Sequence, residues 1–342
     1  VQTCALPILG RYFKDPRLHQ LLGRYATYCG SSPFQAPSTL MLIADVEMQG
    51  VWAVQGGMIA ITQAITKLAH AKGVKFIQGI NCEEIVQTAG KVSGVRLSTG
   101  ETIQTQAVVF NGDAIALQTG LLGQANQHAV QITQATRSLS AITWSMLAKP
   151  SGFPLVRHNV FFNRDYDSEF TDIFYRKRLP QHPTVYICAQ DQTDITSSHS
   201  EGERLLCLVN APAIGDRQQP TLSEIESCQE KSFSLLEHCG LNLSLEEATV
   251  TRTTPQDFHR LFPATGGALY GQANHGWMDT FRRPAAQTAI TGLYLAGGSA
   301  HPGAGVPMAA LSGRMAAATL MAHLGLIKKS GRVLISGGTS MH

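Results

Sequence analysis

Apolar side chains recur along this chain with two spacings, one typical of helices and one typical of strands. Residues 58–68 place them three and four positions apart, which predicts an amphipathic helix that ends at Gly73. The apolar residues from Val74 onward predict a strand after this helix. The helix positions that carry the apolar stripe are Met58, Ile61, Ile65 and Leu68.

Short alternating runs continue the pattern. Residues 91–113 predict two or three strands, with a turn at Thr99 and Gly100. The apolar run that ends at Asn111 predicts a buried strand. A helix, a strand, a hairpin and a further strand in this order are typical of part of an α/β domain.

The stretch 116–284 has a different character. It predicts short strands near 184–190 and 204–211, and an acidic helix that ends at Gly240. Because strands and helices alternate less regularly here, we interpret the stretch as an α+β substrate lobe.

The α/β pattern returns in residues 285–326. Residues 293–296 predict a buried strand, a glycine-rich loop follows, and Pro307 predicts the start of a long helix. Proline at the first helical position makes Val306 the N-cap, and valine has no side-chain oxygen to accept a bond. The loop glycines are Gly297, Gly298, Gly303 and Gly305.

The first turn of this helix is therefore predicted to keep unpaired amides. The N–H groups of Met308, Ala309 and Ala310 have no acceptor in the local sequence. Glycines before such a turn allow close approach of a bound group, and the helix end favours an anion. These features predict a nucleotide-cofactor site. The alternative is an ordinary turn whose amides bind water.

Composition narrows the classes of function. The 342 residues are 44% apolar and 15% charged, and the net charge is +3. So mild a charge, without runs of Arg and Lys, argues against a nucleic-acid partner. Seven cysteines without a C-x-x-C pair are predicted to be free thiols, and the histidine spacing argues against a metal site. No apolar run is long enough to span a bilayer.

Several longer segments resemble one enzyme family. They are HPGAGVPMA in the last glycine loop and, earlier in the chain, GRYATYCGSSPFQAP, GVWAVQGGM, VVFNGD and LFPATGGALYGQANHGW. In their residues and in their order along the chain, these segments resemble the phytoene-desaturase-like carotenoid oxidoreductases. Within these the nearest subgroup is the hydroxycarotenoid 3,4-desaturases, also called methoxyneurosporene dehydrogenases. The resemblance covers roughly residues 9–326.

The resemblance implies a Rossmann-like, two-domain α/β flavoprotein of the class that binds FAD or NAD(P), with an α+β substrate domain. The glycine-rich first βαβ unit of that family is not in this sequence. The implied division is 1–55 as part of the substrate domain, 56–115 as part of the FAD-binding domain, 116–284 as the substrate and membrane-docking domain, 285–326 as the C-terminal FAD-binding segment and 327–342 as an unassigned tail.

The implied cofactor is FAD, with contacts from three segments. Cys82 would meet the adenine side through its backbone, and Asn111 and Gly112 would lie near the adenosine. Two alternatives stay open: Cys82 as a core thiol, and Asp113 as no more than a cap for the next helix. The loop and helix start would contact the pyrophosphate, ribitol and ring through Gly297, Gly298, Ser299, Gly303, Gly305, Val306, Pro307, Met308 and Ala309.

The implied reaction takes a hydride and a proton from a saturated C–C bond beside a polyene. His301 is the candidate catalytic residue. It is expected to be neutral, because the positive helix end disfavours an imidazolium, and to hydrogen-bond the flavin, a substrate hydroxyl or the backbone. A loop histidine with a structural bond is the alternative.

Other side chains near this end carry weaker expectations. Tyr270, His275 and Trp277 would either line the substrate channel or belong to the core. Arg282 and Arg283 are expected on a solvated face.

The implied partners are a long-chain carotenoid and a membrane surface, since a carotenoid is insoluble in water. The protein is expected to be peripheral on the cytoplasmic side of a bacterial membrane, with oxygen or a quinone as electron acceptor. Apolar residues between 12 and 43 would form a docking surface, a tunnel or, by default, core. Alternatives are a carotenoid isomerase or saturase on the same scaffold, and a carotenoid- or lipid-binding remnant without cofactor.

Overall fold

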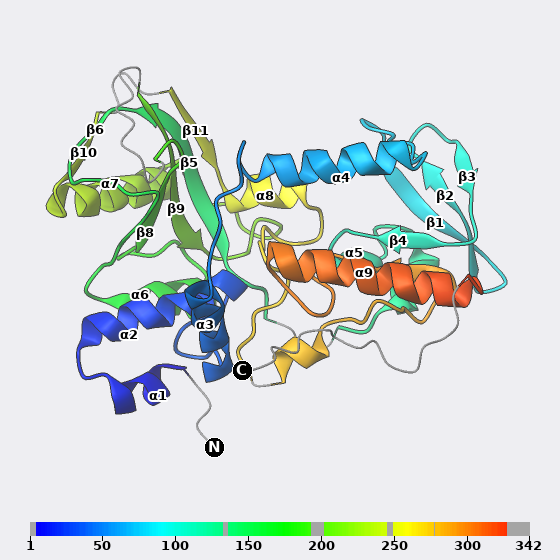
Figure 1. Cartoon of the computed structure of the whole chain (residues 1–342), viewed down its shortest axis with the longest axis horizontal. Coiled ribbons are helices and arrows are strands. Elements are labelled where there is room, and N and C mark those ends of the chain that lie inside the picture. Colours follow the sequence, from blue (N-terminus) through cyan, green and yellow to red (C-terminus); the bar gives the residue numbers. More distant parts are fainter. Residues whose placement is uncertain (1–4, 133–135, 193–201, 245–248, 277, 327–342) are drawn as a thin grey trace.

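The computed structural model describes residues 5–132, 136–192, 202–244, 249–276 and 278–326. They form two lobes, each with sheets and helices of its own (Figure 1). One lobe contains a five-stranded antiparallel sheet. The other contains a three-stranded sheet, a parallel strand pair and the long helices α4 and α9. This mixed α/β architecture agrees with the predicted fold class.

The five-stranded sheet has the order β11-β5-β9-β8-β7, and all neighbours are antiparallel. Alternate side chains of β8 and β9 are buried, as the two-residue period of a strand requires. The strands are β5 (Ser140–Ala148), β7 (His158–Phe161), β8 (Val185–Ala189), β9 (Glu203–Ala211) and β11 (Thr249–Thr253).

Helix α7 (Leu222–His238) is the predicted acidic helix, and it covers one face of this sheet (Figure 1). Thr221 and Glu224 form a capping box at its start, and Gly240 follows its end with a φ of 86°. Leu236 packs with Trp144 of β5 in the largest core cluster. This lobe therefore buries its helix and its sheet against each other.

Short helices gather at one end of this sheet (Figure 1). Tyr166 and Phe170 of α6 form an aromatic core cluster, on which Phe34 packs. The elements are α1 (Ala5–Tyr12), α2 (Pro16–Gly23), α3 (Leu42–Met48), α6 (Tyr166–Thr171), the 3₁₀ helices Arg24–Cys29 and Ser38–Met41 and a π-helical turn at Asp172–Arg176. Of the predicted docking or core residues, Tyr12 and Leu42 are exposed and Phe34 is half-buried, so core does not describe them all.

In the second lobe, β4 and β12 run parallel, with Val108 opposite Leu293. The predicted turn at Thr99 and Gly100 joins the antiparallel strands β2 and β3. The elements are α4 (Ile59–Ala71), β1 (Cys82–Thr88), β2 (Lys91–Leu97), β3 (Thr102–Gln104), β4 (Val108–Phe110), α5 (Ala114–Gln118), β12 (Leu293–Leu295) and α9 (Val306–His323).

Smaller elements connect these parts. The remaining ones are β6 (Pro150–Gly152), β10 (Leu241–Leu243), α8 (Pro255–Leu261) and the 3₁₀ helices Gln124–Ala129 and Asp279–Arg282. The predicted tail 327–342 and Trp277 lie outside the described residues.

Two predictions for the second lobe are wrong. Residues 74–80 form no strand, because no described strand lies beside them to exchange backbone hydrogen bonds. The run that ends at Asn111 is a strand, but it is not fully buried, since Val109 is 44% exposed. The amphipathic helix does form as α4, yet none of its residues is buried.

Candidate cofactor and substrate site

The glycine loop (residues 296–305) leads from β12 into α9. The helix begins at Val306, one residue earlier than predicted, and Gly305 is its N-cap, with φ 107° and ψ 145°. The assignment of Val306 as N-cap is therefore wrong. An N-cap needs a non-helical backbone, and glycine alone adopts this left-handed φ without strain.

Of the three amides predicted to be unpaired, that of Met308 alone remains so; because α9 begins at Val306, the Ala310 N–H belongs to the helix ladder. The Ala309 N–H donates to the carbonyl oxygen of Gly305 at 2.8 Å, which corrects the prediction for this residue. Pro307 has no N–H. In the part of the chain that the structure describes, the N–H groups of Val306 and Met308 have no acceptor. An uncapped 18-residue helix therefore presents two backbone donors and its positive end.

The structure brings the predicted residues of β4 and β12 together. The Asn111 side-chain amide donates to the carbonyl of Ala296 at 3.1 Å. Gly297 has a φ of 112°, and a Cβ there would lie 2.7 Å from Nδ2 of Asn111. The Gly297 N–H donates to Ser312 Oγ on α9 at 2.7 Å. The parallel pairing of the two strands thus sets the entry to the glycine loop.

Ser299 joins the glycine loop to α5. Its hydroxyl accepts a bond from the Ala114 N–H at 3.2 Å and donates to the Gly112 carbonyl at 3.4 Å. Asp113 caps α5 by accepting from the Ile115 N–H at 2.9 Å, as the alternative for this residue proposed. Burial raises the pKa of Asp113.

Arg283 holds the glycine loop from the other side, which corrects its prediction as a solvated residue. Its guanidinium is buried and donates to the carbonyl oxygens of Tyr270 at 3.1 Å, Gln272 at 2.6 Å and Gly298 at 2.8 Å. A Cβ on Gly303 would lie 3.2 Å from Nε of Arg283. Burial lowers the pKa of Arg283. Sequence reasoning missed this role because no carboxylate or motif beside Arg283 marks it.

Arg282 behaves as predicted. Its side chain is 73% exposed and pairs with Asp279 at 3.3 Å on the surface.

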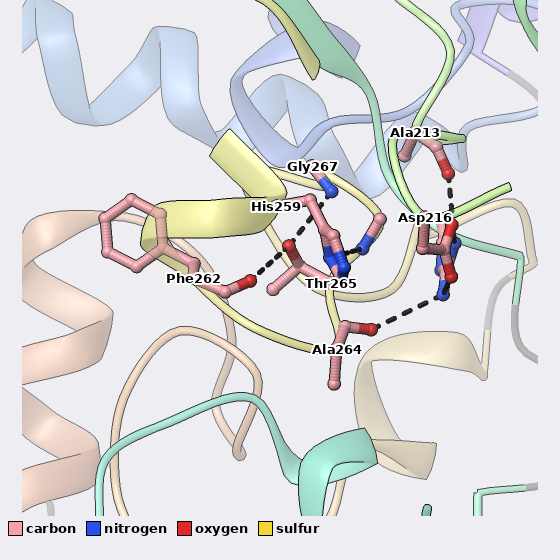
Figure 2. A network of polar contacts seen from close by, with 9 residues as sticks. Ala213, Asp216, His259, Phe262, Ala264, Thr265 and Gly267 are labelled. Atoms are coloured by element: carbon pink, nitrogen blue, oxygen red, sulfur yellow. Dashed lines mark hydrogen bonds and ion pairs between the residues drawn. The ribbon is translucent and has the colours of Figure 1, made fainter. Parts of the chain in front are cut away.

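A second polar network fixes residues 259–267, which precede the Tyr270 and Gln272 carbonyls that bind Arg283 (Figure 2). Arg137 pairs with both carboxylate oxygens of Asp216, at 2.6 and 2.7 Å, and also reaches the Ala264 carbonyl at 3.4 Å. Nδ1 of His259 accepts from the Gly266 N–H at 3.2 Å. The LFPATGG segment is thereby anchored to the lobe of the five-stranded sheet, just before Tyr270 and Gln272.

The remaining candidates lie in different surroundings. Cys82 begins β1 and is exposed, and its thiol donates to the Glu84 carbonyl at 3.9 Å. No bond of the described residues links it to the glycine loop. The His301 N–H donates to the Pro284 carbonyl at 2.8 Å, and its half-buried ring lies in the loop before α9.

His275 is partly buried and is held by contacts with two other residues. Its Nε2 accepts from the Ser32 N–H at 3.0 Å, and its ring packs edge-on against Phe174 at 4.6 Å. Desolvation lowers the pKa of His275 to about 4, so the ring is neutral at neutral pH.

Among the described residues we looked for a membrane-spanning helix and for a metal site. They contain no helix both long and apolar enough to cross a bilayer. They also contain no cluster of three or more metal-ligating side chains.

The glycine loop fits a flat anionic cofactor. The helix end offers two free N–H donors, and a Cβ on Gly305 would meet no atom within 4 Å, so the space beside the loop is open. Val306 and Met308 are exposed there, 58% and 41%, and would be covered by a bound group. Such an end can bind a phosphate or the electron-rich edge of a ring.

Comparison with known proteins shows which of them this chain is similar to. No family model matches the chain. The chain is 56% identical over 333 residues to "Hydroxyneurosporene desaturase" of Rubrivivax gelatinosus, covering 97% of this chain and 63% of that protein. It is 33% identical over 309 residues to "1-hydroxycarotenoid 3,4-desaturase" of Flavobacterium sp. (strain P99-3), covering 89% of this chain and 62% of the relative. The chain thus spans less than two thirds of the length of these relatives.

A solved structure supports the fold. The crystal structure of an oxidoreductase from Methanosarcina mazei matches with a TM-score of 0.58 and 16% identity, covering 93% of this chain and 68% of that one. At this identity the match shows a shared fold and nothing finer. The resemblance read from the sequence is confirmed: this chain is a homologue of the hydroxyneurosporene desaturases and is related to other carotenoid desaturases.

Proposed function

We propose that the whole protein is an FAD-dependent oxidoreductase that acts on a CH–CH bond in carotenoid biosynthesis. Its reaction is the desaturation of C3–C4 in a hydroxylated or methoxylated acyclic carotenoid. The observation that carries this proposal is the 56% identity to a hydroxyneurosporene desaturase over 97% of the chain.

The residues that would hold FAD are those around the glycine loop. When bound, FAD supplies a two-electron acceptor for the hydride that leaves the substrate. The free N–H groups of Val306 and Met308, together with the helix dipole, would stabilise negative charge on a ring edge held there. Gly305 has open space where a Cβ would stand and would let the cofactor approach the backbone closely, whereas Gly297 and Gly303 make room for Asn111 and Arg283. Gly297, Gly298 and Gly303 stay proposed contacts through their backbone.

The other predicted contacts surround this loop. Asn111, Gly112 and Ser299 position it against β4 and α5 through the bonds described above. Cys82 stays a proposed adenine-side residue, acting through its backbone. His301 stays the proposed catalytic residue and is proposed to hydrogen-bond the flavin or a substrate hydroxyl.

The proposed partners follow from the substrate. A long carotenoid is insoluble in water, so the protein is proposed to act peripherally at the cytoplasmic face of a bacterial membrane. Oxygen or a quinone is the proposed electron acceptor. Exposed apolar side chains such as Tyr12, Leu42 and Trp52, at 78%, 66% and 81% exposure, are candidates for the docking surface.

The test is incubation of the full-length flavoprotein with a 1-hydroxylated acyclic carotenoid. Desaturation lengthens the conjugated system, so the absorption maximum moves to longer wavelength and the product loses two hydrogens by mass spectrometry. An unchanged mass would indicate an isomerase, and a shorter chromophore a saturase. A protein that binds carotenoid but no flavin would indicate the cofactor-less remnant.

A further inference from the structure

Tyr270 is held by its backbone, while its hydroxyl is left free. Its N–H donates to Ser138 Oγ at 3.0 Å, and its carbonyl accepts from Nη1 of Arg283 at 3.1 Å. Among the described residues the phenolic hydroxyl has no hydrogen-bond partner. The residue is half-buried and the hydroxyl is not sealed from solvent. This hydroxyl is therefore available to a ligand, as donor or acceptor.

The backbone around Tyr270 lies directly against the glycine loop. A Cβ on Gly271 would lie 3.2 Å from Cα of Ser299 and 3.5 Å from Nη1 of Arg283. The same Nη1 donates to the carbonyl of Gly298 at 2.8 Å. Tyr270 is therefore one residue away from a direct contact with the loop that is proposed to hold the flavin.

The ring of Tyr270 is fixed between this loop and the lobe of the five-stranded sheet. A Cβ on Gly30 would lie 2.6 Å from Cδ2 of the ring and 2.5 Å from Cβ of Ser138, which precedes β5 by two residues. Gly30 has a φ of 67°, and its carbonyl accepts from the Leu139 N–H at 2.9 Å. Only glycine permits so close a contact at this φ, so the ring has a defined place beside the start of β5.

The surroundings of the hydroxyl favour an uncharged ligand. Tyr270 interacts electrostatically with one cation, Arg24, and with two neutral groups, the thiol of Cys29 and the phenol of Tyr28. Arg24 also interacts with the buried carboxyl group of Glu169. Desolvation raises the pKa of Tyr270, so the phenol keeps its proton at neutral pH. A protonated phenol donates to a neutral oxygen atom and can accept from a hydroxyl.

The proposed substrate carries such an oxygen close to the bond that reacts, since only one carbon separates C1 from C3. We propose that the Tyr270 hydroxyl binds the hydroxyl or methoxyl oxygen on C1 of the polyene and so places the C3–C4 bond beside the glycine loop. This inference rests on the proposed function. A hydrocarbon end in the same place would leave the Tyr270 hydroxyl without a partner, which costs binding free energy.

The experiment compares three polyenes of equal conjugated length: the 1-hydroxy compound, the 1-methoxy compound and the plain hydrocarbon. Each is delivered in detergent micelles to the full-length flavoprotein, and binding is followed by the shift of the polyene absorption. Tyr270→Phe removes the hydroxyl alone, and Tyr270→Leu removes the ring as well. Tyr175→Phe is the matched control, since this tyrosine is 69% exposed and its hydroxyl already accepts a bond from Gln35.

The wild-type protein is expected to bind the hydroxylated and methoxylated polyenes about tenfold more tightly than the hydrocarbon. Tyr270→Phe is expected to bring this ratio close to one without weakening hydrocarbon binding, whereas Tyr270→Leu weakens all three and the control keeps the ratio. Tyr270→Phe is expected not to lower the melting temperature, because its hydroxyl binds no other residue. A ratio that persists in Tyr270→Phe, or an equal loss for all three polyenes in that variant, would overturn the inference.

The two proposals fail in different ways. If the wild-type protein desaturates none of the polyenes but still prefers the hydroxylated one, the proposed reaction is wrong while the oxygen site stands. If desaturation proceeds and Tyr270→Phe leaves the binding ratio unchanged, only the oxygen site is wrong.

Discussion

Helices α7 and α4 carry comparable apolar stripes but meet different surroundings. In α7, Ile225, Cys228 and Leu236 are buried against the five-stranded sheet. In α4, Ile65 and Leu68 are 61% and 60% exposed, and no residue of the helix is buried. A helical stripe of apolar residues therefore predicts the helix, but its contribution to stability depends on whether another element covers it.

The same contrast extends to the two lobes. The lobe of the five-stranded sheet has a closed core around Trp144. The second lobe has a buried cluster too, but it leaves the apolar residues Val74, Phe76 and Ile77 about half exposed. Substitutions of equal chemistry should therefore have unequal effects at covered and at uncovered positions. The effect on stability should be largest at fully buried positions and smallest at exposed ones.

The substitution Trp144→Ala should have the largest effect. It empties a fully buried site and removes the bond from Nε1 to Gln229 at 2.9 Å, so the free energy of unfolding should fall by about 3–5 kcal/mol. Denaturant unfolding measures the loss. Trp52→Ala is the control, since Trp52 is 81% exposed and should lose under about 0.5 kcal/mol. If both variants lost the same free energy of unfolding, burial would not explain the effect of Trp144→Ala.

The substitution Arg283→Met should cost about 2–4 kcal/mol, because three carbonyl oxygens lose their common donor. Since Arg283 also holds the glycine loop, the full-length variant should retain less flavin after gel filtration. Arg282→Met is the matched neighbour, and its exposed ion pair should be worth under about 1 kcal/mol. If Arg283→Met retains flavin and stability as well as Arg282→Met does, the loop does not depend on this residue.

The free energy of unfolding should depend on pH through His275. The folded pKa of His275 is about 4, below its ordinary value of 6.5, so the unfolded chain binds the proton more tightly. Stability from this residue is therefore present above pH 6.5 and is lost as the pH falls toward 4, by roughly 2 kcal/mol between pH 7 and pH 5.

The measurement is the difference in unfolding free energy between wild type and His275→Gln at both pH values. The variant should lose less stability on acidification, since glutamine does not titrate. Parallel losses in the two proteins would show that His275 is not held neutral in the core.

The smallest effect should come from the exposed stripe of α4. Ile65→Ala and Leu68→Ala together should change the unfolding free energy of this chain by under about 0.5 kcal/mol. Leu236→Ala on α7, at 1% exposure, should cost about 2–5 kcal/mol in the same assay. A loss of 2 kcal/mol or more in the α4 variant would mean that its apolar face is covered after all.

Much of the local structure was predictable. The helix that ends at Gly240, the strands around 185–189 and 203–211 and the turn at Gly100 all form as the pattern indicates. The glycine loop and its uncapped helix were also predictable, because proline and glycine chemistry acts within a few residues. The N-cap moved from Val306 to Gly305, since the positive φ of glycine was not visible in the sequence.

The parts that sequence reasoning missed depend on distant partners. Residues 74–80 have strand character but no neighbour to pair with among the described strands. The sequence around Arg283 does not indicate that the residue is buried. Arg137 binds Asp216, which lies 79 positions further along the chain. Ser299 meets Ala114 across 185 positions.

By itself, the sequence determined several helices and strands, the glycine loop with an uncapped helix after it and the relationship to the carotenoid desaturases. Those features depend on backbone preferences and side chains that lie close together along the chain. Only the tertiary structure decided which apolar stripe is buried and which arginine binds the glycine loop. Burial and hydrogen-bond pairing depend on groups that only folding brings into contact.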